Sequence, residues 1–267
     1  MSKDTIALIV LAACALLVTS FAALALPPPG TSEWEDQFTG NRLTNSRWAV
    51  VNGFNPGNIA GNHRSYAQPD RVSVSGGNLV ILLTQENGPV DGNPNGVISR
   101  GGAIYTKRTS GYGTYEWRMR MSSTAASPTA AGNSVSGSVS AGFIYVNNSQ
   151  TEIDMEFSGH APDTLFMTNW LNPNPAADPS PSNATSSMVT VSGISSAFKT
   201  YRFVWAPGSI AFYVNDAPQT AHTSNVPTAP AYFMINHWGA NNQWFGGLAT
   251  IGTPRYFYVD WAKYTPL

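Results

Sequence analysis

The sequence contains almost no cysteine, which limits both its chemistry and the ways in which its fold can be stabilised. Cys14 is the only cysteine among 267 residues, and it lies in an apolar N-terminal segment that is predicted to be removed on export. A mature chain without cysteine forms no disulfide, binds no metal through a thiolate and uses no cysteine nucleophile. The fold must therefore be held by its core, helped at most by a bound cation.

Charged residues are also scarce, and neither sign dominates. They make up 11% of the chain, with 14 Lys and Arg residues against 15 Asp and Glu residues. A phosphate backbone is bound by a broad field of positive charge, which this composition does not provide. Nucleic acid is therefore not an expected partner.

Several common catalytic motifs are missing. The chain has no Gly-x-Ser-x-Gly elbow and no Walker sequence, and Gly111-Tyr-Gly113 lacks the third glycine of a dinucleotide loop. Its histidines show no zinc-binding spacing; they are His63, His160, His222 and His237. These absences leave the carboxylates as the main candidates for chemistry.

Residues 1–25 are predicted to be an export signal. Lys3 gives a positive start, residues 6–18 form an apolar run, and Ala23-Leu24-Ala25 offers a small-x-small cleavage site. Two alternatives are an uncleaved membrane anchor, since the whole stretch is nearly long enough to span a bilayer, and lipidation at Cys14. With cleavage after Ala25 we expect a secreted protein without stable membrane association.

The rest of the chain is predicted to be one all-β domain. Residues 26–32 are rich in proline and read as a short linker, which leaves residues 33–267 as the main domain. The chain has 24 Gly and 19 Pro residues, a balance typical of many short strands joined by turns. No repeat of 20 to 50 residues is present, so a sandwich of two sheets is favoured over a propeller or solenoid. A monomer is expected.

Local patterns place the strands and loops of this domain. Gly76-Gly77-Asn78 is predicted to join two strands in a hairpin, with the second strand starting at Leu79. Residues 87–96 and 172–187 are rich in Asn, Pro, Gly or Ser and are expected to be loops, and residues 122–136 read as an exposed low-complexity loop.

One stretch, residues 151–157, carries an unusual charge pattern. Glu152, Asp154 and Glu156 alternate with apolar residues, which is the period of a strand with one buried face. Three acids in line repel one another and gain nothing from packing, so function explains them better than structure does. Paired carboxyls are the working groups of glycoside hydrolysis, in which one attacks or activates water and the other protonates the leaving oxygen.

The spacing of the acids does not by itself prove that they act together. A rise of about 3.3 Å per residue places the Cα atoms of Glu152 and Glu156 about 13 Å apart, whereas a retaining pair needs carboxyl groups about 5 to 5.5 Å apart. Long side chains can lean together over a shared bond. Asp154 lies between them and is predicted to share a proton with a glutamate, so that one glutamate stays ionised and the other protonated.

The motif and its surroundings resemble glycoside hydrolase family 16. Residues 152–157 are similar to the Glu-x-Asp-x-Glu strand of that family. Four further segments resemble those of bacterial β-1,3-1,4-glucanases (lichenases) and occur in the same order: residues 110–120, 198–214, 235–238 and 260–264. The resemblance implies a β-jelly-roll sandwich with a concave substrate-binding face. It also implies a retaining endo-β-glucanase that acts on β-glucan by double displacement and needs no cofactor for catalysis.

Carried over position by position, the resemblance implies a role for each acid. Glu152 is the expected nucleophile, Asp154 the assisting acid and Glu156 the acid/base. A single residue between Asp154 and Glu156 resembles lichenases and xyloglucan-active members, which favours a glucan that contains β-1,4 linkages. Asp260 matches an aspartate that binds a structural calcium ion in many relatives.

Sugar rings stack on aromatic side chains, with polar groups at their edges. The expected substrate-binding residues are Gln150, Trp170, Asn236, Trp238 and Trp244. Trp238 and Trp244 are predicted to lie at a cleft rim, whereas Trp205 and Trp261 are predicted to be core.

The sequence also departs from the lichenases. Gln150 stands where they carry a tryptophan, residues 99–105 lack their Glu-Asn-Arg segment, and their cysteine pair is absent. Substrate contacts near the cleavage point are therefore expected to differ. Two alternatives remain open: a cell-wall transglycosylase or xyloglucan-active enzyme of the same fold, and a non-catalytic lectin-like sandwich.

Overall fold

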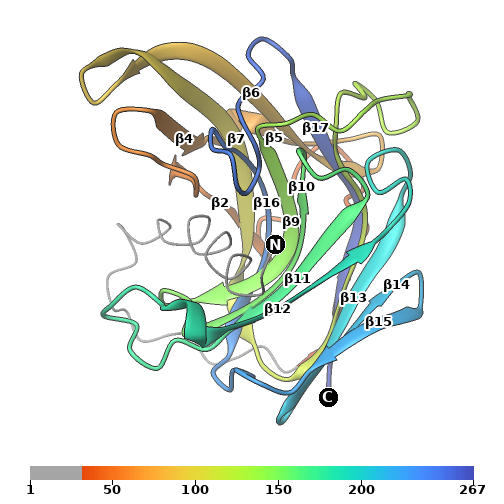
Figure 1. Ribbon diagram of the computed structural model, residues 1–267. Coiled ribbons are helices and arrows are strands. Elements are labelled where there is room, and N and C mark those ends of the chain that lie inside the picture. Colours follow the sequence, from red (N-terminus) through yellow and green to blue (C-terminus); the bar gives the residue numbers. More distant parts are fainter. Residues whose placement is uncertain (1–31) are drawn as a thin grey trace.

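The computed structural model describes residues 32–267, which form seventeen strands and two short 3-10 helices (Figure 1). The predicted export signal, and all of the predicted linker except Ser32, lie outside the described residues. Within residues 32–267, no helix has the length and apolar character needed to cross a membrane.

Seven antiparallel strands form sheet A. Their order across the sheet is β2 (Trp48–Val50), β7 (Asn93–Ser110), β16 (Ala231–Gly239), β9 (Ser138–Val146), β10 (Thr151–Ser158), β11 (Thr164–Trp170) and β12 (Ala184–Thr190). The acidic segment is β10, which has a partner strand on each side. In Figure 1 this sheet is bent, with its open side turned away from the second sheet.

The second sheet, sheet B, covers the other side of the core. Its order is β5 (Val72–Ser75), β6 (Asn78–Val90), β17 (Arg255–Pro266), β8 (Gly113–Ser123), β13 (Lys199–Ala206), β14 (Ser209–Val214) and β15 (Ala217–His222), and β1 (Trp34–Asp36) lies beside β17.

A smaller sheet joins the two. It contains β3 (Gly53–Phe54) and β4 (His63–Ala67), and β4 runs parallel to β7. In the same sheet, the C-terminal half of β6 pairs with the N-terminal half of β7. The 3-10 helices are η1 (Pro69–Arg71) and η2 (Pro181–Asn183).

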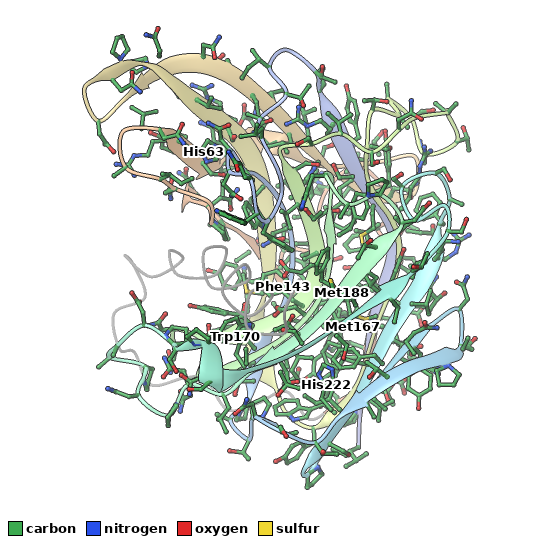
Figure 2. The ribbon with its side chains drawn as sticks, viewed as in Figure 1. His63, Phe143, Met167, Trp170, Met188 and His222 are labelled. Carbon is green, nitrogen blue, oxygen red and sulfur yellow. The ribbon has the colours of Figure 1, made fainter. Side chains whose placement is uncertain are left out.

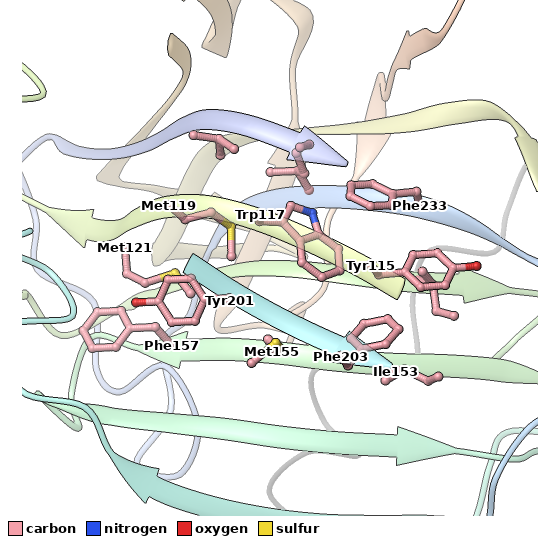
Figure 3. Packing of buried hydrophobic residues seen from close by; sticks show 14 of the residues in the cluster. Tyr115, Trp117, Met119, Met121, Ile153, Met155, Phe157, Tyr201, Phe203 and Phe233 are labelled. Carbon is pink, nitrogen blue, oxygen red and sulfur yellow. The ribbon is translucent and has the colours of Figure 1, made fainter. Parts of the chain in front are cut away.

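The core lies between sheets A and B and explains the apolar half of the acidic segment. Ile153, Met155 and Phe157 have no exposed surface and point into this core (Figure 3). They meet aromatic and methionine side chains of β8, β13 and β16, including Trp117 and Phe233, whose ring centroids are 4.5 Å apart. Burying one such side chain contributes about 1.5–3 kcal/mol. The core therefore fixes which face of β10 its acids occupy.

The predicted all-β sandwich and the glycine hairpin are confirmed, although β6 begins at Asn78, which the prediction placed in the turn. Both glycines have positive φ values, 59° and 73°, in the two-residue turn between β5 and β6. Trp205 is buried as predicted, but Trp261 is only half-buried.

The loop predicted for residues 87–96 is wrong. β6 continues to Val90 and β7 begins at Asn93, so that Asn87 pairs with Val97 and only Asp91-Gly92 turns the chain. Those two residues have φ values of 47° and 85°, as a tight Asp-Gly hairpin turn requires. The loop was predicted because residues 87–96 are rich in Asn, Gly and Pro. The Asp-Gly pair is nevertheless a local signal for a hairpin.

The other two predicted loops are each partly strand. The loop predicted for residues 172–187 ends early, because β12 begins at Ala184. This strand is rich in Ser and Thr and pairs along its length only with β11, so it lacks the hydrophobic alternation of the central strands. Residues 122–136 are also not wholly exposed, since Ser122, Ser123 and Ala125 are buried at the end of β8.

Candidate active site

The three acids of β10 lie in a row on the face of sheet A opposite the core, here called the carboxylate face. Their neighbours are set by the register with β9 and β11, because residues directly opposite one another share a face. Glu152 lies between Tyr145 and Trp170, Asp154 between Phe143 and Thr168, and Glu156 between Ala141 and Phe166. Aromatic side chains thus line the row on both sides.

All three acids are removed from water. Glu152 and Asp154 are each 2% exposed and Glu156 is 4% exposed. Burial penalises the charged form of a carboxyl group, and neighbouring carboxylates add to that penalty. The protonation states in this row are therefore set by burial and by the neighbouring acids.

The pKa values of two of these acids are raised. Burial raises the pKa of Asp154 well above its usual range, and the charges of Glu152 and Glu156 and a hydrogen bond with Glu152 raise it further. Burial, followed by the charge of Glu152, raises the pKa of Glu156 to about 8. At neutral pH Glu156 is thus mostly protonated, which is the state that a general acid needs.

Glu152 has a partner in the turn that precedes β10. The hydroxyl of Ser149 donates a hydrogen bond to Oε2 of Glu152, and both residues are buried. This contact was not predicted from the sequence. A hydroxyl donor favours the ionised form of the carboxyl group that it binds.

Several polar atoms of the carboxylate face have no hydrogen-bond partner within the described chain. They are Oδ2 of Asp154, Oε2 of Glu156, Oδ1 of Asn236 and Nε1 of Trp170, and all are buried. Buried polar atoms are normally paired, so a group of unpaired ones on one face calls for an explanation. The hydroxyl groups of a bound ligand would pair with these atoms.

The predicted substrate-binding residues are only partly brought together. Trp170 lies opposite Glu152, and Asn236 lies on β16 beside Ala141, which is the neighbour of Glu156. Gln150 is half-buried in the turn before β10, where its side chain accepts a hydrogen bond from Asn147.

The two tryptophans predicted for a rim differ. Trp244 is 59% exposed in the loop after β16, as a rim residue would be. Trp238 is 1% exposed and packs with Val139, Phe166 and Phe245, so the predicted rim position is wrong. The same loop folds back and places Phe245 against it, with ring centroids 6.2 Å apart. Val139 and Phe166 come from β9 and β11, far from Trp238 in the chain, so the burial of Trp238 has no local signature.

The carboxylate face also has apolar residues, most of them aromatic, that were not predicted. Phe143, Tyr145 and Met234 form a cluster on it, against which Tyr105 and Tyr232 pack. Figure 2 labels Phe143 and Trp170 of this face, and Met167 and His222, which lie toward the core side. Alternation within β9 and β16 could have assigned these residues to one face, but only the register places that face beside the acids.

Asp260, the predicted calcium ligand, has another partner. Its carboxylate forms an ion pair with the guanidinium of Arg118. In residues 32–267 no group of three His, Cys, Asp or Glu side chains could hold a metal ion. Arg118 supplies the positive charge that a calcium ion would supply, so the side chains fit an ion pair better than a cation site. Calcium binding stays a prediction.

The sequence model of glycosyl hydrolases family 16 matches residues 60–263. A β-glucanase of Acetivibrio thermocellus is 30% identical over 205 residues, which are 74% of this chain and 54% of that protein. A β-glucanase of Bacillus subtilis is 28% identical over 164 residues, 59% of this chain and 60% of that protein. The chain thus spans little more than half the length of these two relatives.

The fold is also that of solved β-glucanases. The structure of the Bacillus licheniformis β-glucanase superposes with a TM-score of 0.68 at 24% identity, covering 88% of this chain and 99% of that one. This likeness establishes the fold, and the predicted jelly-roll sandwich is confirmed. The family match covers well over half of the chain and includes the acidic strand, so the chain belongs to family 16 of the glycosyl hydrolases.

Proposed function

We propose that this chain is an exported, retaining endo-β-glucanase that cleaves β-1,3-1,4-linked or related β-glucan. The observation that carries the proposal is the buried row of Glu152, Asp154 and Glu156, in which burial and neighbouring charge raise the pKa values of Asp154 and Glu156 while Glu152 accepts a hydrogen bond from Ser149. Membership of family 16 and the similarity to β-glucanases support the reaction class and the substrate.

In the proposed reaction the two glutamates divide the chemistry. The carboxylate of Glu152 attacks the anomeric carbon while the bond to the glycosidic oxygen breaks, and Glu156 gives its proton to that oxygen. The product is an ester between Glu152 and the sugar. A water molecule then attacks the anomeric carbon, Glu156 takes a proton from it, and Glu152 leaves as a carboxylate.

Asp154 supports this division from between the two glutamates. Its raised pKa keeps it protonated, and its hydrogen bond with Glu152 lets it donate that proton toward the nucleophile. A neutral Asp154 also spares the row a second negative charge beside that of Glu152. The proposed role is therefore to stabilise ionised Glu152 without repelling it.

A glucan chain would be bound along the carboxylate face. Trp170 lies beside Glu152, and Asn236 and Glu156 offer unpaired polar atoms that sugar hydroxyls can satisfy. Exposed Trp244 would stack on a ring farther along the chain. Stacking supplies affinity, and the polar atoms fix the orientation of the rings.

Transfer to a second sugar is a further candidate outcome, because one observation favours it. All three acids are nearly free of exposed surface, and a site that excludes water protects a covalent intermediate from hydrolysis. Products longer than the starting oligosaccharide would reveal this transfer.

The proposal is tested by measuring reducing ends released from barley mixed-linkage glucan, laminarin, xyloglucan and agarose. We expect the mixed-linkage glucan to be cut fastest, and Glu152→Gln and Glu156→Gln to lower the rate by several orders of magnitude while the chain still folds and binds polysaccharide. Activity of either variant close to that of the wild type would refute the assignment of the acids. Failure to cut any of the four polymers would refute the proposed activity.

A further inference from the structure

The turn that leads into β10 has an unusual backbone. Asn147, Asn148 and Ser149 follow one another with φ values of 45°, 49° and 60°. This left-handed region is disfavoured for residues with a side chain, because Cβ approaches the carbonyl oxygen, and it is normally visited by single residues. Three in succession persist only where the surroundings hold them.

A neighbouring loop supplies that support. The backbone N–H of Asn172 donates to the carbonyl oxygen of Ser149 at 2.9 Å, and its side-chain Nδ2 donates to the carbonyl of Asn148 at 2.8 Å. In return, Nδ2 of Asn148 donates to the carbonyl of Ala177 at 3.0 Å. The turn is thus fastened to the chain that leaves β11, two residues beyond Trp170.

The left-handed turn brings Ser149 to a place that an extended chain would not reach. In a continuous strand, residues i and i+3 point to opposite faces, about 10 Å apart along the chain. Ser149 and Glu152 are separated by that interval, yet the hydroxyl of Ser149 binds Oε2 of Glu152. The contact is buried, with Ser149 at 1% and Glu152 at 2% exposure. The strained backbone therefore places the Ser149 hydroxyl where it can bind this carboxylate.

We propose that Ser149 is a positioning residue that holds Glu152 ionised and oriented for attack on the anomeric carbon. This inference rests on the proposed function of Glu152. The hydroxyl hydrogen stabilises the carboxylate charge and restricts rotation of the carboxyl group, and Asp154 donates to the same group from within β10. Ser149 does not touch the reacting carbon and acts only through Glu152.

Ser149→Gly separates this role from a purely structural one. Glycine adopts positive φ without steric cost, which offsets the greater conformational entropy that it gives the unfolded chain, so the variant should unfold at about the same temperature as the wild type. It lacks the hydroxyl, so we expect kcat on mixed-linkage glucan to fall about 10- to 100-fold with little change in KM. Ser149→Ala should lose a similar factor in kcat, with lower stability.

A pH profile provides a readout that a structural role would not move. Losing a donor to the ionised form should shift the acidic limb of kcat/KM to higher pH in both Ser149 variants. Asn147→Gly is the matched control, because it relaxes an exposed position of the same turn. The Asn147 side chain binds Gln150 and not Glu152. It should keep kcat within about twofold of the wild type and leave the acidic limb in place.

The outcomes separate the two proposals. A Ser149→Gly variant with wild-type kcat and pH profile, in an enzyme that Glu152→Gln inactivates, would overturn the positioning role and leave the glucanase proposal intact. A wild-type chain without activity on any β-glucan would overturn both. Equal loss of kcat in Asn147→Gly and Ser149→Gly would also overturn the positioning role, since the backbone of the turn would then be the cause.

Discussion

Glu152, Asp154 and Glu156 have the same functional group in different surroundings. Glu152 is bound by the Ser149 hydroxyl, whereas Glu156 has a buried oxygen without a partner within the described chain. The first environment favours the charged form and the second favours the neutral form. Two roles can thus arise from one residue type on one strand.

Azide rescue tests which glutamate has which role. In Glu152→Ala, azide can take the place of the missing carboxylate and attack from the same side, and we expect the α-glycosyl azide. In Glu156→Ala the covalent intermediate still forms with an activated aryl glycoside, and azide attack on it should give the β-glycosyl azide. The anomeric configuration is read from the proton NMR spectrum of the product. The opposite pair of products would mean that the two roles are exchanged.

The pH dependence of activity tests Glu156 as the general acid. Its pKa is raised to about 8 by burial and by the charge of Glu152. It donates a proton only below that pH, so kcat/KM should fall about tenfold per pH unit on the alkaline side. An aryl glycoside whose leaving group needs no proton serves as the control, since its glycosylation step should lose the alkaline limb. A limb that stays with this substrate would assign it to another group.

At the scale of the element, β10 is a strand with two different faces, and each face depends on a neighbouring strand. On its core side, Met155 lies directly opposite Gly142 of the neighbouring strand β9. A Cβ atom added at Gly142 would lie 2.8 Å from two ring atoms of Trp117, which is closer than carbon atoms approach. The missing side chain therefore lets the β8 tryptophan pack on sheet A.

Gly142→Ala should consequently destabilise the chain by about 1–3 kcal/mol, because the added methyl group overpacks a rigid core. Urea unfolding followed by tryptophan fluorescence measures this change. Gly111→Ala is a matched control, since nothing lies within 4 Å of a Cβ atom at that position and its φ is not positive. Equal stability of the two variants would show that Trp117 can move away from sheet A.

At the scale of the whole molecule, the carboxylate face costs stability that the core must offset. A carboxyl group whose pKa is raised by folding binds more protons in the folded state than in the unfolded state. Stability then falls as pH rises between the unfolded and the folded pKa. For Glu156 these values are 4.5 and about 8. Buried acids of this kind are typical of sites shaped for activity at the expense of stability.

Glu156→Gln should reduce this pH dependence. We expect the free energy of unfolding of the wild type to decrease between pH 5 and pH 8.5, and the variant to lose less over the same range because glutamine does not ionise. Urea titrations at several pH values measure both slopes. Asp70→Asn is the control, because the Asp70 side chain is 69% exposed and should leave the slope unchanged. Parallel curves for the wild type and Glu156→Gln would contradict the assigned pKa.

Local patterns in the sequence were sufficient to predict much of this fold. The alternation of residues 151–157 predicted a strand with an acidic and an apolar face, since side chains in a strand alternate with a period of two. The glycine turn at residues 76–77 and the all-β class were likewise predicted from local chemistry, and the ordered motifs indicated the family. Asp91-Gly92 shows that a local signal can also be present and missed.

Only the tertiary structure decided which side chains meet the acids. The packing of Trp238 against Val139 and Phe166, the apolar cluster around Phe143 and the ion pair of Asp260 all join segments far apart in the chain. Ser149 is near Glu152 in sequence, but its contact depends on a left-handed turn that Asn172 holds from another loop. Strand register and loop packing result from the balance of many distant contacts, so a local pattern predicts the faces of a strand but not what lies beside them.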